Sequence, residues 1–307
     1  MDIIVFLKSV FRRTNKNWKL LIVQFVTYLI MIPILAIGVI VPALIIVIPI
    51  ATNHYEVEDF APYILSNIVI VLFGVLIFLI FLLIVLLLWA FVAGGIRATV
   101  VENILKGKVF EMKTFMENCR KFFARLIGLW SLFGLIYTGI FVIFGGFAAA
   151  IFFFCYRLYQ SSQAAAITTG IAGGGILLLI YVVIAVLFAV YSIIANTYLI
   201  VEDAQVGESM RGGMAFIKKY PGHTFLVFLI LLAIGLGVGM AYAIVTMPIR
   251  IIPYVGAMAS LVLSPIQMAL NLYLSLFSII AYTLFYLMKT KKIDQDFGIS
   301  TVPEKTI

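Results

Sequence analysis

The sequence is poor in charge, in cysteine and in histidine. Only 11% of its 307 residues are charged, about half the share of an ordinary soluble domain. In contrast, 64% are apolar or aromatic, and the mean hydropathy is +1.21. So much apolar surface cannot be hidden in a water-soluble fold of this length, which excludes a soluble and a disordered protein. Two cysteines also exclude a disulfide scaffold and a CxxC metal site.

Six stretches contain no Asp, Glu, Lys or Arg. They are residues 20–55, 60–96, 126–156, 158–201, 220–249 and 251–288. Each exceeds the roughly 20 residues that a helix needs to cross the hydrocarbon core. Because charged side chains are costly at the bilayer centre, these stretches predict an all-α, polytopic membrane protein. We expect six transmembrane helices in a single transmembrane domain that covers residues 1–307.

The basic residues are distributed unevenly between the connecting segments. Of the 21 Lys and Arg residues, 19 lie in the N-terminal segment, in residues 97–125 and 202–219, and at the C-terminal end. These segments share one side of a six-span layout, and Arg157 and Arg250 lie on the other. Positive charge marks the cytoplasmic side, so both termini are predicted to be cytoplasmic, in a multi-pass protein of a prokaryotic cell membrane. The same bias explains the net charge of +8 without nucleic-acid binding.

A weak repeat has a period near one hundred residues. An acidic residue follows a long span twice, with a glycine five positions later. These residues are Glu102 with Gly107, and Glu202, followed by Asp203, with Gly207. The repeat units would be 1–95, 96–201 and 202–290, each an amphipathic cytoplasmic helix and two spans, followed by a cytoplasmic tail at 291–307. The matches are few, so chance similarity is the alternative. Residues 97–125 fit a helix in the headgroup region or a solvated connector.

The last span carries uncharged polar residues at helical spacing. They are Ser260, Ser264, Gln267, Asn271, Ser275, Ser278 and Tyr282. Separations of three and four residues place them on one face. This polar face is either a packing seam that bonds to other helices or the wall of a hydrated cavity. Pairs of small residues four apart also predict close helix contacts. They are Ala90 with Gly94, Gly145 with Ala149, and Gly235 with Gly239.

Groups that would carry catalysis are missing. No nucleophile, base and orienting residue fall together in the sequence, and no cofactor motif occurs, so we expect neither enzyme activity nor a cofactor. His54 lies with Glu56, Glu58 and Asp59 in one loop, which could bind a divalent cation, although such loops are usually just solvated and we predict no metal site. No ionisable residue is expected deep in a span, which argues against ion pumps and voltage sensors.

One cytoplasmic connector has a more specific pattern. An acidic pair, a glycine and a glutamate lead an amphipathic helix that ends in basic residues before the next span. These are Glu202, Asp203, Gly207, Glu208, Lys218 and Lys219. The pattern resembles prokaryotic six-span proteins similar to the membrane domain that accompanies some bacterial glycerophosphodiester phosphodiesterases. That family usually has a serine near the position of Gly212, which this chain lacks. The resemblance implies no catalysis, because the family's soluble hydrolase barrel has no counterpart here.

These observations predict a non-catalytic integral membrane protein that engages lipids or organises a membrane partner. Membrane lipids are the expected partners, with another membrane protein as the second kind, and no nucleic acid is expected. The alternative is a transporter or channel for a neutral or amphiphilic small solute, which would use the polar face of the last span. A membrane-domain helper of a lipid-metabolising enzyme is a third interpretation.

Overall fold

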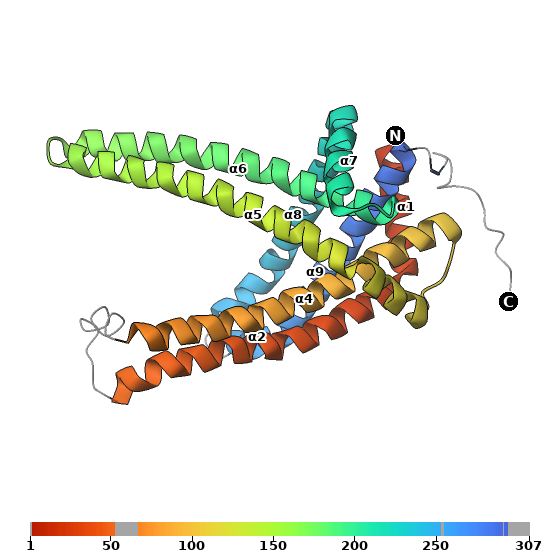
Figure 1. The fold of residues 1–307 in the computed structure, drawn as a ribbon, viewed down its shortest axis with the longest axis horizontal. Helices are drawn as coiled ribbons and strands as arrows, with labels where there is room; N and C mark the ends of the chain where they lie inside the picture. Colours follow the sequence, from red (N-terminus) through yellow and green to blue (C-terminus); the bar gives the residue numbers. More distant parts are fainter. Residues whose placement is uncertain (1, 53–66, 253–254, 291, 294–307) are drawn as a thin grey trace. The chain divides into compact units, whose positions relative to one another are not determined.

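The structure is a computed structural model that describes residues 2–52, 67–252, 255–290 and 292–293. In these ranges every regular element is an α-helix (Figure 1). The helices are α1 (Ile3–Lys16), α2 (Trp18–Thr52), α4 (Ile68–Lys106), α5 (Met112–Tyr159), α6 (Gln163–Val201), α7 (Val206–Lys219), α8 (Pro221–Ile251) and α9 (Val255–Lys289). The loop with His54 and its neighbouring carboxylates, and the tail beyond residue 293, lie outside the described residues.

Six of these helices are long and apolar enough to cross a membrane: α2, α4, α5, α6, α8 and α9. This confirms the predicted all-α, multi-pass class. The longest, α5, has 48 residues, and at 1.5 Å per residue it is about 72 Å long. A hydrocarbon core is only about 30 Å thick. The ends of such a helix therefore reach into the headgroup region or beyond it, which leaves room for polar sites on the same helix.

Local signals set where several helices begin and end. Gly107 follows α4 with φ of +65°, a left-handed conformation that glycine adopts without strain. Its N–H donates to the carbonyl of Asn103 at 3.1 Å. The hydroxyl of Ser162 accepts from the N–H of Ala165 at 3.4 Å and caps α6. These caps satisfy backbone groups that a helix end would leave unpaired.

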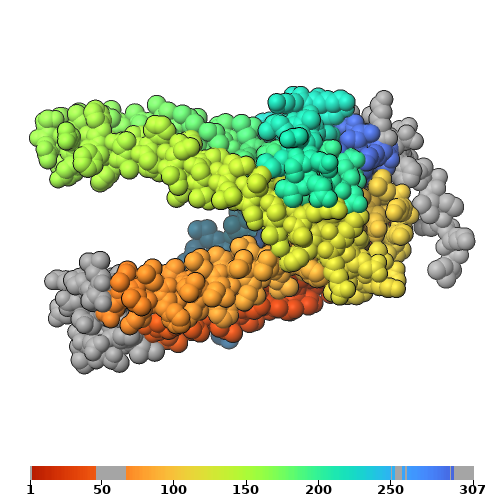
Figure 2. All heavy atoms as spheres, in the orientation of Figure 1, coloured from red at the N-terminus to blue at the C-terminus, as the bar shows by residue number. Residues whose placement is uncertain are grey.

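The chain forms two compact units, and one of them comprises residues 8–123 and 252–277. Its main feature is the antiparallel hairpin of α2 and α4, whose side chains form a continuous surface on the face drawn in Figure 2. The rings of Tyr28 and Trp89 lie 5.4 Å apart across the hairpin. A Cβ added to Gly38 would lie 2.5 Å from that of Phe81. A glycine therefore lets the two helices approach closely.

The other unit comprises residues 1–7, 124–251 and 278–307. In it α5 and α6 form a second long hairpin (Figure 1), with the rings of Phe133 and Phe188 5.4 Å apart. The core of the unit lies where α7 packs on α6 and on the end of α9. The ring of Phe216 on α7 stands 5.7 Å from fully buried Phe285 and 4.8 Å from Tyr286.

The middle connector differs from the expectation of a separate amphipathic helix within residues 97–125. Instead α4 continues to Lys106, and α5 begins at Met112 and runs into the span without a break. The physical reason is the local sequence. α7 ends at Lys219 and α8 begins at Pro221, because proline favours the start of a new helix, whereas nothing near Arg125 interrupts α5. The threefold repeat itself stays a prediction.

The two short helices, α1 and α7, each bury one face. In α1, Phe6, Val10 and Thr14 are buried at intervals of four residues, and the lysine and arginine side chains at positions 8 and 12 are exposed. In α7, Ser209, Gly213 and Phe216 are buried. This arrangement is typical of an amphipathic helix that packs on a helix bundle beside the headgroups.

Candidate functional site

The predicted polar face lies along α9, and its exposure changes from one end to the other. Ser264, Gln267 and Asn271 are exposed, Ser275 and Ser278 are half-buried, and Tyr282 is buried. The side chain of Ser260 is outside the described part of the structure. Among the described residues, the amides of Gln267 and Asn271 make no hydrogen bond. The choice between a packing seam and a cavity wall therefore stays open along this face.

Glu202, predicted as a connector residue, joins two helices at the end of α6. One carboxylate oxygen accepts a hydrogen bond from the hydroxyl of Tyr286 at 2.8 Å, and the other accepts one from the ammonium of Lys292 at 2.8 Å. Tyr286 is only 2% exposed. The carboxylate thus satisfies a buried hydroxyl, and its contacts hold the end of α6 to the end of α9.

The neighbouring connector residues also have structural contacts. Asp203 has φ of +53°, and its carboxylate lies 2.7 Å from the guanidinium of Arg125. The carboxylate of Glu208 accepts from the N–H of Gln205 at 3.1 Å and so caps α7. Gly207 has open space around it. These residues build the turn from α6 into α7.

Close contact between α6 and α7 restricts the side chains that fit at positions 212 and 213. A Cβ added to Gly212 would overlap the ring of Tyr198. At the next position, a Cβ on Gly213 would lie 2.9 Å from the Cα of Ala195. The ring of Tyr198 is itself held 6.1 Å from that of Tyr286. Gly213 therefore lets the backbone of α7 approach that of α6, and Gly212 leaves room for the ring of Tyr198.

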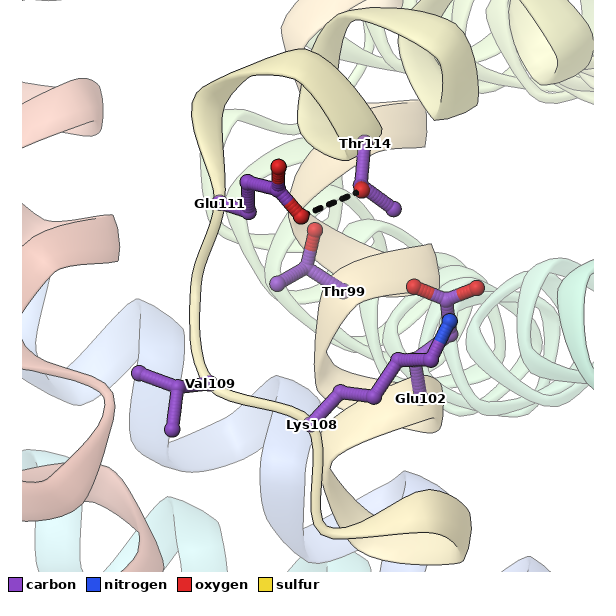
Figure 3. Close-up of a pocket in the computed structure, with 6 residues that line it drawn as sticks. All are labelled: Thr99, Glu102, Lys108, Val109, Glu111 and Thr114. Carbon is purple, nitrogen blue, oxygen red and sulfur yellow. Dashed lines mark hydrogen bonds between the residues drawn. The ribbon is translucent and has the colours of Figure 1, made fainter.

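The other predicted connector, at the end of α4, encloses a polar pocket of about 280 Å³ (Figure 3). It is lined by Thr99, Glu102, Lys108, Val109, Glu111 and Thr114. One carboxylate oxygen of Glu111 accepts from the hydroxyl of Thr114 at 3.2 Å. One oxygen of Glu102 accepts from the amide of Asn118 at 3.4 Å. The second oxygen of each carboxylate accepts no hydrogen bond from the described residues.

Sequence reasoning missed Thr99, which lies one helical turn before Glu102 on α4. It is 7% exposed, and its hydroxyl has no hydrogen-bond partner among the described residues. In Figure 3 this hydroxyl points toward Glu111. A buried hydroxyl without a partner is costly, so it indicates a missing ligand or water. The only sign of Thr99 in the sequence is its spacing of three residues from Glu102, which places both residues on one face of α4.

The hairpin of α5 and α6 contains an apolar groove of about 630 Å³. Three glycines open it: Gly145 on α5, and Gly170 and Gly174 on α6. No atom lies within 4 Å of a Cβ added at position 145 or 174. The prediction of close helix contacts at Gly145, Gly235 and Gly239 is therefore wrong, because each of these glycines faces open space.

The two ends of this groove are chemically different. At one end the hydroxyls of Tyr137 and Tyr181 form a hydrogen bond of 2.7 Å between the helices, and Tyr181 lines the groove. At the other end lies Cys155, two residues before exposed Arg157. The guanidinium of Arg157 lies 6.0 Å from the centre of the Phe153 ring. An apolar groove with a cation near one end suits an amphiphile.

Within the described ranges, no three His, Cys, Asp or Glu side chains come together as a metal site. Two places among the described residues offer space for a ligand: the polar pocket at the α4–α5 connector and the apolar groove between α5 and α6. No known protein family, curated protein or solved structure matches the chain.

Proposed function

We propose that this protein is a non-catalytic integral membrane protein that binds membrane lipids, with both termini in the cytoplasm of a prokaryotic cell. The observation that carries the proposal is the groove of about 630 Å³ between α5 and α6. Its volume falls within the range of about 300–1,000 Å³ that small-molecule sites occupy. Its lining is mostly aliphatic, aromatic and glycine residues, so the matching ligand is a hydrocarbon chain.

A lipid acyl chain is the natural occupant, because the groove lies in a hairpin that is long enough to span the bilayer. Lipid tails are as apolar as leucine, so selectivity in the membrane comes from packing and from polar contacts. Gly145 and Gly174 provide the room for packing. Arg157 is exposed two residues beyond Cys155, with its guanidinium over the ring of Phe153, so its long side chain lies beside the end of the groove and could meet a lipid phosphate there. The positive-inside bias places this arginine at the outer leaflet.

Filling the groove tests the proposal. Gly145→Leu and Gly174→Leu each add a side chain where the structure has empty space, so both variants should fold. The matched controls are Gly146→Leu and Gly175→Leu, which also have open surroundings and do not line the groove. In native mass spectrometry from mild detergent, we expect the first pair to retain several-fold less phospholipid than the controls. Equal retention in all four variants would refute binding in the groove.

A free thiol provides an independent measurement. Cys155 lines the groove and is partly exposed, whereas Cys119 is buried. Labelling of the detergent-solubilised protein by N-ethylmaleimide should therefore report on Cys155. Added phosphatidylglycerol, which supplies an acyl chain and a phosphate, should slow this labelling. The protection should weaken in Arg157→Gln, and an unchanged labelling rate would contradict an acyl chain beside the thiol.

The second candidate is a transporter or channel for a neutral or amphiphilic solute. The observation in its favour is the pair of exposed amides, Gln267 and Asn271, on one face of α9, because polar groups inside a membrane often mark a substrate path. Changing Gln267, Asn271 and Ser275 together to Leu should abolish glycerol flux into liposomes if this path exists. Flux that is absent from the wild type, or equal in the triple variant, would exclude glycerol transport along this face.

A further inference from the structure

The polar pocket between the end of α4 and the start of α5 shares no lining residue with the groove between α5 and α6. We propose that it binds a phosphoethanolamine headgroup, with the primary ammonium held among Thr99, Glu102 and Glu111 and with the phosphate near Lys108. This site is chemically independent of the acyl-chain groove, because all of its lining residues lie between positions 99 and 114.

The charges around the pocket favour a zwitterion. Two carboxylates, Glu102 and Glu111, and one ammonium, Lys108, line the same volume. Neither carboxylate forms an ion pair with Lys108 in the structure. A simple cation would be attracted by the carboxylates but repelled by Lys108, whereas an anion would be attracted by Lys108 but repelled by the carboxylates. A ligand with one positive and one negative group satisfies both signs at once.

The hydrogen-bonding groups favour a primary ammonium as the positive part. A primary ammonium has three N–H donors and no acceptor. The pocket is lined by Thr99, whose buried hydroxyl oxygen has no hydrogen-bond partner in the described part of the chain. Each carboxylate also has one oxygen that accepts no hydrogen bond from the described residues. In Figure 3 the Thr99 hydroxyl lies toward the Glu111 oxygen that accepts from Thr114, an oxygen with a second lone pair. A trimethylated ammonium has no N–H to donate, so it would leave these acceptors unsatisfied.

The pocket's position favours a lipid as the carrier of this headgroup. It lies at the last turns of α4, a helix of 39 residues, which is longer than a bilayer core requires. Val109, in the loop at the pocket's edge, is 70% exposed. An apolar side chain exposed among charged ones is expected where a loop meets the acyl boundary of a membrane. The volume of about 280 Å³ is suited to a headgroup rather than to a whole lipid.

The test compares headgroups that differ only in methylation. The full chain is reconstituted in nanodiscs of phosphatidylcholine with a minor share of phosphatidylethanolamine, and retained lipids are identified by native mass spectrometry. Wild type should retain phosphatidylethanolamine preferentially. Glu102→Gln with Glu111→Gln should lower that preference by about tenfold, because charge-assisted hydrogen bonds are lost. Thr99→Val should lower it less.

A matched control has the same change of charge outside the pocket. Glu117→Gln removes an exposed carboxylate of α5 that does not line the pocket, and it should leave the preference unchanged. Gly145→Leu should also leave it unchanged, which separates this proposal from the groove. Equal preference in wild type and in the double Glu102 and Glu111 variant would overturn the proposal. Loss of preference in Glu117→Gln would also overturn it, since surface charge alone would then decide.

Soluble O-phosphoethanolamine distinguishes the source of the headgroup. If it displaces retained phosphatidylethanolamine from wild type at millimolar concentration, the headgroup is sufficient, and a free zwitterion is also a ligand of the pocket. If it does not displace the lipid while the carboxylate variants still lose the preference, the ligand is the membrane-anchored form. Both results support the site.

Discussion

Removing one hydroxyl from Tyr286 should destabilise the protein more than removing the whole charged side chain of Lys292. Both side chains donate to Glu202 at 2.8 Å, but their surroundings differ. Tyr286 is 2% exposed, whereas the ion pair of Lys292 and Glu202 has side-chain exposures of 35% and 28%. Water therefore competes with the ion pair of Lys292 and Glu202, but hardly at all with the hydrogen bond from Tyr286 to Glu202.

The two magnitudes follow from that difference. A buried hydrogen bond to a charged group contributes about 1.5–3 kcal/mol, and Tyr286→Phe removes it while keeping the ring. The ring contacts with Phe216 at 4.8 Å and Tyr198 at 6.1 Å remain. We expect a loss of about 2 kcal/mol. An exposed ion pair is worth about 0–1 kcal/mol, so Lys292→Ala should cost less than about 1 kcal/mol.

The assay is unfolding in detergent micelles, followed by circular dichroism as denaturant is added, with both variants measured at the same protein and detergent concentrations. Glu202→Gln combined with each change completes two double-mutant cycles and isolates each pairwise term. The reasoning is refuted if Lys292→Ala costs as much as Tyr286→Phe. It is also refuted if the coupling of Tyr286 to Glu202 is close to zero.

Three other substitutions are suggested by the structure, and one fusion experiment is suggested by the charge bias of the sequence. Gly213→Ala should lower the free energy of unfolding by about 1–3 kcal/mol through overpacking, since its Cβ would lie 2.9 Å from the backbone of Ala195. Gly207→Ala lies in open space and should be neutral or slightly stabilising in the same unfolding assay. Gln24→Met should raise the free energy of unfolding, because neither polar atom of this buried amide has a hydrogen-bond partner among the residues that the structure describes. Destabilisation would contradict this. A fluorescent protein on either terminus should mature in the cytoplasm, and two silent fusions would contradict the topology.

Much of the fold follows from charge placement in the sequence. Charge-free runs predict six spans, and the described residues contain six helices that are long and apolar enough to cross a membrane. Helical spacing predicts that Gln267 and Asn271 share one face of α9, but it does not predict that both side chains are exposed. The extent of α5 was not foreseen, because an amphipathic pattern near Arg125 does not show whether the helix continues. That depends on whether a residue such as Pro221 interrupts the backbone.

The contacts of the candidate sites could not be predicted in the same way. The connector pattern predicts Glu202 as a site residue, but its hydrogen bond with Tyr286 joins residues 84 positions apart. Thr99 is an ordinary helix residue in the sequence, and only its burial without a partner marks it. For Gly145, the sequence shows a small residue but cannot show whether a neighbouring helix fills the space.

Composition and charge order thus decide that the chain is a six-span helical membrane protein, because the cost of a charge in hydrocarbon acts on each residue separately. The groove between α5 and α6 and the pocket at the α4–α5 connector depend on the tertiary structure. A cavity forms where side chains of different segments approach without filling the space between them. The hydroxyl of Thr99 stands out because no described side chain or backbone group is close enough to form a hydrogen bond with it. The cavities and the hydroxyl without a partner depend on distances between segments, and these distances cannot be read from the order of the residues.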